Sequence, residues 1–455
     1  MVGPTEALAA FAVRTSSKEL PADVVRSAMR AILDCTGVAL AGSMEPASQI
    51  MADLARAQGG ELECTMWGMR GRTTAQSAAL VNGIAAHALD FDDVSRNLPG
   101  HPTVSVLPAV MAAGERLGAT GADVLAAFAI ALEAELKLGK FTGQHSFDIG
   151  WHTTTTLGVI GAAVGVGKLL GLDLVQMRRA IGLAVAQASG VRQSHGTMGK
   201  PFHVGRAAQS GILAADLAAR GFTGSERAVE GEYGYWDMFG GAVSRDGDAL
   251  AAELGKPFDL VAPGIIYKIY PCCAQTHPSI DVARSLSAGL TADEIEKVVV
   301  EVPYTAPITL THHRPTTGLA GKFSLEYCVA VALLDGQVGV GQFDDTAVNR
   351  PDAQSVLRRV EYRVPEKWSK ETGSTHKGHV TVEVRLKDGT VRRGETTLPK
   401  GYEANSLTDE EMRDKFLDCA TPAIGDYQAR KALELLSVLD RLDNVRQLTE
   451  ALAVQ

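Results

Sequence analysis

Apolar residues recur every three or four positions along the first part of the chain, which is the spacing of one face of an α-helix. Pro21 suits the first turn of a helix, where its missing N–H group costs nothing, and Val24, Ala28 and Ile32 follow it at this spacing. Glycine-rich turns separate further segments of the same kind, residues 74–89, 104–116, 121–138, 153–170, 173–188 and 206–219. No alternating strand pattern interrupts them, so we expect residues 1–266 to form an all-helical domain.

Beyond residue 267 the pattern changes, and apolar and polar residues alternate in short runs as they do in half-buried β-strands. These runs are residues 298–302, 359–363, 380–386 and 390–397. Asp388 and Gly389 lie between the last two runs and are a strong hairpin-turn signal. Helical patterns near residues 278–289 and 324–334 lie between the strands, so we expect residues 267–399 to form a smaller α+β domain.

The helical pattern returns after Pro399, over residues 411–419 and 430–452. We expect these helices to complete the first domain, so that residues 400–455 join residues 1–266. The fold would then be mainly α, with a large all-helical domain and a smaller α+β lid inserted into it. At 455 residues the chain is long enough for two such domains.

The composition of the chain argues against several classes of function. A net charge of −9, with no run of lysine and arginine, argues against a nucleic-acid-binding surface. The six cysteines form no C-x-x-C pair and the first residues lack a secretory pattern, which predicts a reduced, cytoplasmic protein. Residues 153–170 are too short and too rich in threonine and glycine to span a membrane. An anionic substrate would need a local cationic pocket in this acidic protein.

Three aspartates follow the helix predicted over residues 74–89. Asp90 lies three positions after His87, on the same helical face, and its apolar neighbours predict that it is buried. Asp92 and Asp93 either belong to the same site or are carboxylates of a polar helix end that meet solvent. Charged groups rarely occur in apolar surroundings unless they are paired or used, so this segment is a candidate for catalysis.

Two histidines lie where the chain enters a helix. His101 belongs to a Gly-His-Pro loop that leads into a helix near Thr103, and His152 precedes the helix predicted over residues 153–170. The rigid loop would hold the ring of His101 in place for catalysis, although a capping histidine is the alternative. The start of the helix after His152 favours an anion, because the positive end of the helix dipole lies there.

Two lysines complete the candidate set. Lys200 lies in a glycine-rich segment and precedes Pro201, which disfavours the helical region at Lys200. A surface lysine needs no such surroundings, so we expect Lys200 to be functional. Lys268 lies at the proposed domain boundary, where clefts usually form. Cys273 lies nearby with no basic activator beyond His277, which favours buried packing over a cysteine nucleophile.

Other motifs indicate neither a nucleotide nor a metal. In residues 165–171 the glycine spacing does not fit a dinucleotide loop, and the lysine there is followed by leucine instead of the serine or threonine of a phosphate-binding loop. The pairs His312 with His313 and His376 with His379 have no nearby carboxylate at the spacing of metal ligands on a helix. We therefore expect no metal and no organic cofactor.

Several motifs, taken together and in this order, resemble the MmgE/PrpD family. They are His87-Ala-Leu-Asp-Phe-Asp-Asp93, Gly100-His-Pro102, Gly150-Trp-His152, Gly199-Lys-Pro-Phe-His-Val-Gly205, Lys268-x-Tyr-Pro-Cys-Cys273 and Gly321-Lys-Phe-Ser-Leu-Glu-Tyr327. That family includes 2-methylcitrate dehydratase, cis-aconitate decarboxylase and iminodisuccinate epimerase. The resemblance covers nearly the whole chain and implies a helical domain with an inserted α+β lid, a homodimer, and catalysis without metal or organic cofactor.

The resemblance also implies roles for particular residues. The site residues of the decarboxylase branch are matched here by Asp90, His101, His152, Lys200 and Lys268. Two positions depart from that branch, because Val94 stands in place of a threonine and Cys273 in place of a histidine. These departures weigh against decarboxylation and leave the shared residues unchanged. His203 and Cys273 are expected to contact the substrate.

The chemistry that the resemblance implies is proton transfer at a carbon next to a carboxylate. Nearby cations must stabilise the developing negative charge, which suits Lys200 and Lys268. A base and an acid must also flank the carbon, with Asp90, His101 and His152 as candidates. The leading hypothesis is a cofactor-independent lyase that dehydrates a 2-hydroxy di- or tricarboxylate, as 2-methylcitrate dehydratase does. The alternatives are epimerisation of a substituted succinate, decarboxylation of cis-aconitate, and binding of carboxylates without catalysis.

Overall fold

Most of the periodic segments of the first half of the chain form helices close to their predicted bounds, but the helix predicted over residues 121–138 continues to Asp148. The structure, a computed structural model, describes residues 2–241, 246–369 and 379–454. The helices are α1 (Pro4–Arg14), α2 (Ala22–Gly42), α3 (Pro46–Gln58), α4 (Ala75–Ala88), α5 (Thr103–Leu117), α6 (Gly121–Asp148), α7 (Thr153–Leu169), α8 (Leu174–Val185), α9 (Gly199–Ala219) and α10 (Gly247–Glu253). Side chains cap several of them, as Thr120 does for α6 and Asp173 for α8.

Helix α9 begins earlier than predicted. It starts at Gly199, so Lys200 has a helical backbone although it precedes Pro201. The expectation of a non-helical Lys200 was wrong, because Pro201 falls in the first turn, where a backbone amide has no partner within the helix. The all-helical pattern is also broken once, by the two-residue strands β1 (Cys64–Thr65) and β2 (Arg72–Thr73).

Helices α4 and α9 approach each other closely at two glycines. A Cβ atom on Gly83 would lie 2.8 Å from the Cα atom of Gly205, and one on Gly205 would lie 2.3 Å from the carbonyl oxygen of Leu80. Larger residues would push the two helices apart, because the interior has no spare room. His87 lies one turn beyond Gly83 and Lys200 lies in the first turn of α9, so this close packing brings both side chains together.

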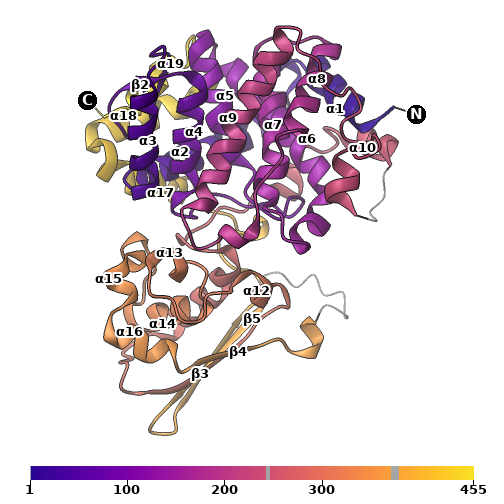
Figure 1. Cartoon of the computed structure of the whole chain (residues 1–455). Helices are drawn as coiled ribbons and strands as arrows, with labels where there is room; N and C mark the ends of the chain where they lie inside the picture. The colour runs from indigo at the N-terminus through magenta and orange to yellow at the C-terminus, as the bar shows by residue number, and fades with distance from the viewer. Residues whose placement is uncertain (1, 242–245, 370–378, 455) are drawn as a thin grey trace.

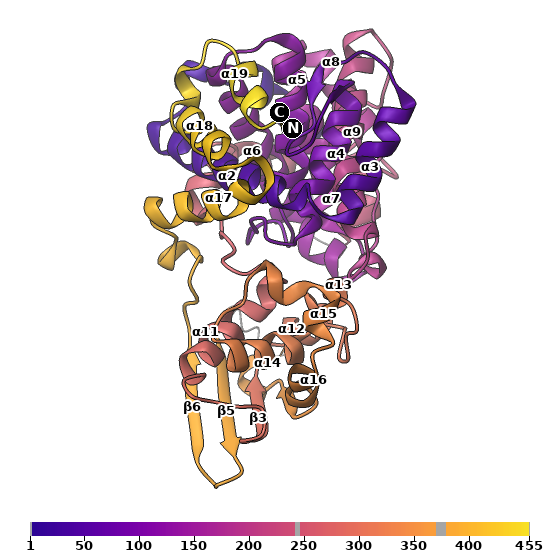
Figure 2. The same cartoon turned by 90° about the vertical axis from the view of Figure 1, so that its left-hand side faces the viewer.

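The alternating segments form a four-stranded sheet with the order β4-β3-β5-β6. The strands are β3 (Ile295–Glu301), β4 (Val360–Arg363), β5 (Val380–Leu386) and β6 (Val391–Thr396). Strand β3 pairs in parallel with β4 and antiparallel with β5, with Val298 opposite Val384. Strands β5 and β6 form the predicted hairpin, and Gly389 in its turn has a φ of 88°, which suits glycine. Figure 2 shows β6, β5 and β3 side by side.

Short helices cover this sheet and build a second core. They are α11 (His277–Leu286), α12 (Thr305–Thr309), α13 (Gly318–Gly321), α14 (Leu325–Asp335), α15 (Asp345–Val348) and α16 (Pro351–Leu357). The inward valines of the sheet, Val298 and Val384 among them, pack with Ile280 of α11 and Ala330 of α14. We call this part the sheet lobe and propose residues 267–399 as its bounds, because its core draws on residues 270–386.

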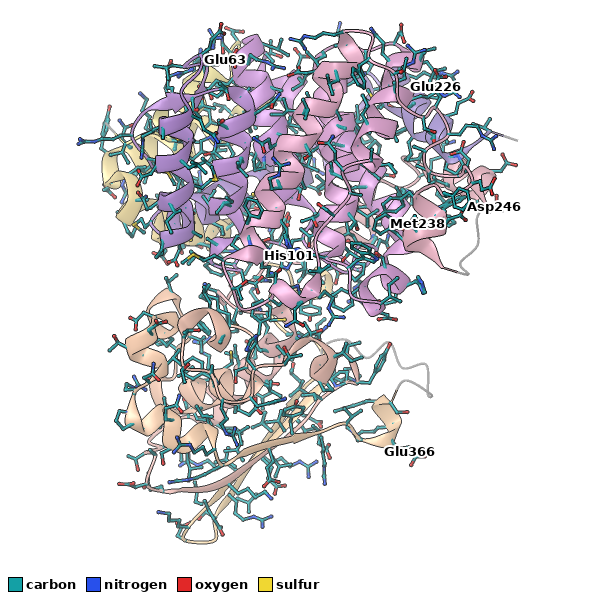
Figure 3. All side chains as sticks on the ribbon, in the orientation of Figure 1. Glu63, His101, Glu226, Met238, Asp246 and Glu366 are labelled. Atoms are coloured by element: carbon teal, nitrogen blue, oxygen red, sulfur yellow. The ribbon has the colours of Figure 1, made fainter. Side chains whose placement is uncertain are left out.

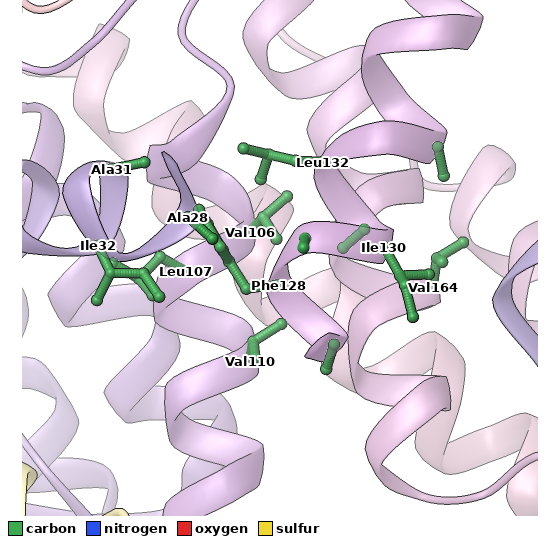
Figure 4. Packing of buried hydrophobic residues seen from close by; sticks show 14 of the residues in the cluster. Ala28, Ala31, Ile32, Val106, Leu107, Val110, Phe128, Ile130, Leu132 and Val164 are labelled. Carbon is green, nitrogen blue, oxygen red and sulfur yellow. The ribbon is translucent and has the colours of Figure 1, made fainter. Parts of the chain in front are cut away.

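The C-terminal helices return to the helical lobe, which lies above the sheet lobe in Figure 1. They are α17 (Asp409–Ile424), α18 (Asp426–Ser437) and α19 (Arg446–Ala451), so the pattern predicted over residues 430–452 is broken after Ser437. Phe416 of α17 joins the same core as Ile32 of α2 and Phe128 of α6, the last two of which are labelled in Figure 4.

The predicted fold class is confirmed: the protein is mainly helical, with a small mixed sheet. Within the described ranges, no helix has the length and apolar character that crossing a membrane requires.

Candidate active site

A cavity of about 140 Å³ lies where the two lobes meet, near the position of His101 in Figure 3. It is lined by five of the predicted site residues, Asp90, His101, His152, Lys200 and Cys273. The sheet lobe also contributes Gln275, Thr305, Thr309 and Phe323. This volume is below the usual range for drug-sized ligands, so the cavity suits a small molecule.

Asp90 lies just beyond the end of α4, with a φ of 52° that is uncommon for a residue other than glycine. Its Oδ1 atom accepts a hydrogen bond from Nζ of Lys200. The Nζ atom of Lys268 lies 3.2 Å from Oδ2 of Asp90 and donates to its main-chain oxygen at 2.7 Å. Burial alone would raise the pKa of Asp90, but the two ammonium groups hold it well below its usual range. Asp90 is therefore a carboxylate at neutral pH.

His87 meets Asp90 through Lys200 and not along one helical face as predicted, because α4 ends at Ala88. Nζ of Lys200 lies 2.8 Å from Nε2 of His87, and Nδ1 of His87 lies 2.8 Å from Oδ2 of Asp92. An ammonium group only donates, so Nε2 of His87 accepts and the ring carries its proton on Nδ1. Burial lowers the pKa of His87 to about 3, so this ring is neutral.

Asp92 contacts two histidine rings. Its Oδ2 atom lies 2.8 Å from Nδ1 of His87 and 2.9 Å from Nδ1 of His101. Burial alone would raise the pKa of Asp92, but these two rings hold it well below its usual range. With Nδ1 of His101 facing Asp92, its Nε2 atom faces Oδ1 of Asp90 at 3.6 Å. Burial lowers the pKa of His101, which favours the neutral ring, in which one of the two nitrogens has a free lone pair.

The reading of Asp92 and Asp93 as solvent-exposed carboxylates is wrong, because both side chains are buried. Asp93 does not line the cavity; it accepts hydrogen bonds from the main-chain N–H and the hydroxyl group of Thr103, at the start of α5. Burial raises the pKa of Asp93 to about 8, and the charges of Asp34 and Asp92 raise it further while the hydroxyl of Thr103 opposes the shift. Asp93 therefore anchors the loop that carries His101.

His152 lies at the N-cap position of α7, as predicted, and its side chain is buried in the cavity wall. Neither ring nitrogen has a hydrogen-bond partner within the described part of the chain. Its neighbours are the rings of His195 and His203, with centroids 5.3 and 5.7 Å away. Burial lowers the pKa of His152 well below its usual value. Buried polar atoms normally have partners, so this neutral ring is available to a ligand.

The three remaining predicted site residues differ in how close they lie to the cavity. His203 does not line the cavity, and its Nε2 atom lies 3.5 Å from Oγ of Ser194. Lys268 is buried beneath Asp90 and reaches the cavity only through that residue. Cys273 lines the cavity, where burial raises the pKa of its thiol to about 12. A cysteine in this state is not an activated nucleophile.

Sequence reasoning missed two cavity residues. His195 lines the cavity, and its ring stacks on Phe323 of the sheet lobe with centroids 5.3 Å apart. The signal was present, because His195 belongs to the same glycine-rich segment as Lys200. Arg96 also lines the cavity, and its guanidinium group donates to both carboxylate oxygens of Glu403, at 2.6 and 3.0 Å. No local motif marks Arg96.

Four side chains at or near the cavity are candidate metal ligands. His87, Asp90, Asp92 and His101 place ligand atoms within 4.8 Å of one another. Nζ of Lys200 already donates to two of these four side chains, at Nε2 of His87 and Oδ1 of Asp90. A divalent cation would have to displace this ammonium group, since two like charges repel strongly at such a distance. The donor set therefore fits the ammonium better than a metal.

The pair of His312 and His313 does not point to a metal either. Nε2 of His312 lies 3.3 Å from the main-chain oxygen of His195, and Nδ1 of His313 lies 3.0 Å from the carboxylate of Glu326. These two rings therefore have separate partners. His376 lies outside the described residues.

The comparisons with known proteins agree with this arrangement of two lobes. Residues 6–246 match the MmgE/PrpD N-terminal domain, and residues 270–441 match the MmgE/PrpD C-terminal domain. The cis-aconitate decarboxylase of Homo sapiens is 26% identical over 446 residues, covering 94% of this chain and 90% of the human protein. Those of Mus musculus and Aspergillus terreus are each 27% identical, covering 98% and 99% of this chain and 93% and 96% of their own lengths. The chain therefore belongs to the MmgE/PrpD family.

Proposed function

We propose that this protein is a lyase that acts on a small di- or tricarboxylate without a metal or an organic cofactor. The observation that carries the proposal is the surroundings of Asp90. Its buried carboxylate is held by the ammonium groups of Lys200 and Lys268. The ring of His152, which has no hydrogen-bond partner in the described part of the chain, lines the same cavity. This arrangement provides positive charge and neutral proton acceptors in one small space. Membership of the MmgE/PrpD family supports the same class of activity.

Lys200 and Arg96 are the groups that we assign to the substrate carboxylates. Both line the cavity, and a charged donor forms a strong hydrogen bond with a carboxylate. Lys268 was predicted to act with Lys200 on the negative charge of the substrate, but Asp90 lies between Lys268 and the cavity. We therefore assign Lys268 to the orientation of Asp90. Arg96, whose side chain is 40% exposed, would leave Glu403 to bind the second carboxylate.

His101 and His152 are the groups that we assign to proton transfer. Asp92 faces Nδ1 of His101, so Nε2 is free to take a proton, and the carboxylate would stabilise the imidazolium that forms. Neither ring nitrogen of His152 has a partner among the residues that the structure describes, and His152 serves as the second proton-transfer group. Asp90 is a weaker base, because two ammonium groups stabilise its ionised form.

Decarboxylation of cis-aconitate is the first reaction to test, because the relatives of this chain carry that name. The C–C bond to one carboxylate breaks, CO₂ leaves, and its electron pair stays on the remaining carbon skeleton. The carbon skeleton then takes one proton, which comes from solvent and would be relayed through the ring of His101 or His152. Lys200 would stabilise the negative charge as it develops. The product is an unsaturated five-carbon dicarboxylate.

Dehydration of a 2-hydroxy acid is the second candidate, and two cavity residues favour it. Val94 and Cys273 both line the cavity, at positions where the resemblance implies a threonine and a histidine in the decarboxylases. In dehydration a base removes the proton next to a carboxylate, the C–O bond breaks, and the hydroxyl group leaves as water after it takes a second proton. His101 and His152 would serve in both reactions. Epimerisation would use the same first step and return the proton to the opposite face.

A product assay in heavy water tests these reactions together. The protein is incubated with cis-aconitate, 2-methylcitrate and substituted succinates, and products are identified by nuclear magnetic resonance. Decarboxylation gives the five-carbon product, dehydration gives an alkene, and epimerisation gives deuterium in the substrate without an alkene. Lys200→Met should abolish most turnover. Lys140→Met is the matched control, because Lys140 pairs with Glu253 on the surface, away from the cavity. Binding of every acid without turnover would contradict the proposal.

A further inference from the structure

A lysine from the C-terminal helices reaches the loop that carries Asp90. Lys415 lies on α17, and its Nζ atom donates to Oδ1 of Asp34 at 2.7 Å. It also donates to the main-chain oxygens of Phe91, at 3.1 Å, and of Lys268, at 2.7 Å. An ammonium group has three donors, so each N–H has a partner. The side chains of Lys415 and Asp34 are only 9% and 1% exposed, so these bonds are sheltered from water.

The two carbonyl groups that accept from Lys415 lie on either side of the contact between Asp90 and Lys268. Phe91 follows Asp90 directly, and Lys268 donates its own Nζ to the main-chain oxygen of Asp90 at 2.7 Å. Lys415 therefore fixes the backbone on both sides of this contact. Its Nζ also lies over the ring of Phe91, 4.0 Å from the centroid, which adds a cation–π contact to the same residue.

Asp34 on α2 balances the charge of Lys415. Burial raises the pKa of Asp34, and the ammonium of Lys415 opposes that shift. A buried lysine without a partner is costly, and so is a buried carboxylate, so each of the two needs the other. The pair links helix α2, the end of α4 and the start of the sheet lobe through a single ammonium group.

We propose that Lys415, paired with Asp34, is a positioning residue for the reaction. It holds the backbone of Phe91 and Lys268 so that Asp90 keeps its φ of 52° and presents its carboxylate to the cavity. Lys415 does not line the cavity, so it acts through the backbone and not on the substrate. The proposal rests on the function proposed above for the same site.

Lys415→Met tests this role, because it keeps the length of the side chain and removes the charge and the donors. We expect kcat to fall about ten- to a hundredfold, because Asp90 holds the ammonium group of Lys200 and small displacements of such a group can cost this much. KM should stay within about twofold of wild type, because the groups that bind substrate remain. Lys415→Arg keeps the charge and several donors and should recover part of kcat. Lys168→Met is the matched control: Lys168 also donates to two main-chain oxygens, at the other end of α7 from His152, and its loss should leave kcat unchanged.

Hydrogen exchange provides a second measurement that needs no substrate. Amides of residues 89–94 should exchange faster in Lys415→Met than in the wild type or in Lys168→Met. Unchanged exchange and unchanged kcat in a folded Lys415→Met protein would overturn the proposal. If that variant does not fold, Asp34→Asn is used instead, because it keeps the ammonium group of Lys415 and removes the negative charge that pairs with it. The same two measurements, kcat and hydrogen exchange, then test the proposal. A wild-type protein that turns over no carboxylate would contradict the proposed function alone, and the exchange data would still test the positioning of Asp90.

Discussion

The Nζ atom of Lys200 lies 2.8 Å from Nε2 of His87, where the first turn of α9 meets the last turn of α4. This contact decides the protonation of the ring, because the ammonium group leaves Nε2 as an acceptor and Nδ1 as the donor to Asp92. The same ammonium group donates to Asp90. One lysine thus stabilises a carboxylate at the cavity and orients, through His87 and Asp92, the ring of His101.

Lys200→Met should impair both binding and turnover. A charge-assisted hydrogen bond to a carboxylate contributes about 1.5–3 kcal/mol, so binding should weaken roughly ten- to a hundredfold. Part of the loss should appear in kcat, because the charge to be stabilised grows in the transition state. Steady-state kinetics on the acid that the product assay identifies measures both effects. Near-wild-type kinetics with a fold intact by circular dichroism would show that Lys200 has no role in the reaction.

Asp92→Asn and Asp93→Asn form a matched pair of adjacent isosteric changes. Asp92 orients two rings, and an amide cannot accept from both with full charge, so kcat should fall about a hundredfold or more. Asp93 contacts Thr103 outside the cavity, and the amide oxygen of asparagine can still accept a hydrogen bond from Thr103 and hold the loop, so this change should leave kcat within about twofold. The two rate constants are compared at one pH. Equal losses in the two variants would contradict the assignment of Asp92.

Stability should depend on pH through Asp93. An aspartate in an unfolded chain ionises near pH 4, whereas burial raises the pKa of Asp93 to about 8 in the folded protein. Between these values the unfolded chain has lost this proton while the folded protein retains it. The contribution of Asp93 to stability is therefore complete below about pH 4 and declines as the pH rises to about 8.

Asp93→Asn removes this titration. Its melting temperature relative to wild type should rise by roughly 10 °C between pH 5 and pH 8, since each pH unit between the two pKa values is worth about 1.4 kcal/mol and about 1 kcal/mol shifts the melting temperature by roughly 2–4 °C. Thermal unfolding followed by circular dichroism at several pH values measures the difference. A constant difference between the two proteins would mean that Asp93 ionises at its ordinary pKa.

Val94→Thr with Cys273→His should favour decarboxylation. Both side chains line the cavity, and the double change restores the residues that the resemblance implies for the decarboxylase branch. The added imidazole provides a further proton donor for the carbon that loses CO₂, an effect worth about a hundredfold when well placed. The ratio of five-carbon product to dehydrated product, read from one nuclear magnetic resonance spectrum, should rise at least about tenfold. An unchanged ratio would show that these two positions do not determine which reaction the protein catalyses.

Activity should survive removal of divalent metals. Lys200 donates to two of the four potential ligand residues, His87 and Asp90, and a lysine in that position stabilises the anion that a metal would otherwise stabilise. The rate after dialysis against a chelator should match the untreated rate. Loss of activity that zinc or magnesium restores would show that a metal replaces the ammonium group in the working enzyme.

Local pattern was sufficient for most helices and for part of the site. Helices α4, α5 and α7 lie within a residue or two of their predictions, because each has a regular apolar pattern and a clear start. Asp90, His101, His152 and Lys200 could be selected because charged groups stood out in apolar surroundings. The start of α9 was missed, since the effect of Pro201 depends on whether it falls in a first turn.

The remaining features depend on contacts between distant parts of the chain. In the sequence, Asp92 looks like any polar residue that follows a helix. Its role becomes visible only in the fold, where two histidine rings contact its carboxylate. Lys415 lies more than three hundred positions from Phe91, and its helix has an ordinary mixed composition. No periodicity or spacing encodes such a pairing, because it arises only when the C-terminal helices pack beside α2.

The insertion of the sheet lobe has a consequence for the order of folding. The two ends of the lobe meet at Tyr267 and Gly401, where the amide of Tyr267 donates to the carbonyl oxygen of Gly401 at 3.0 Å. Closing a flexible loop of roughly 130 residues costs about 4 kcal/mol of chain entropy. If the sheet lobe folds first around its own core, its ends already lie together and α17 is delivered beside α2. The final helices can then pack against the rest of the helical lobe without first closing a long loop of unfolded chain.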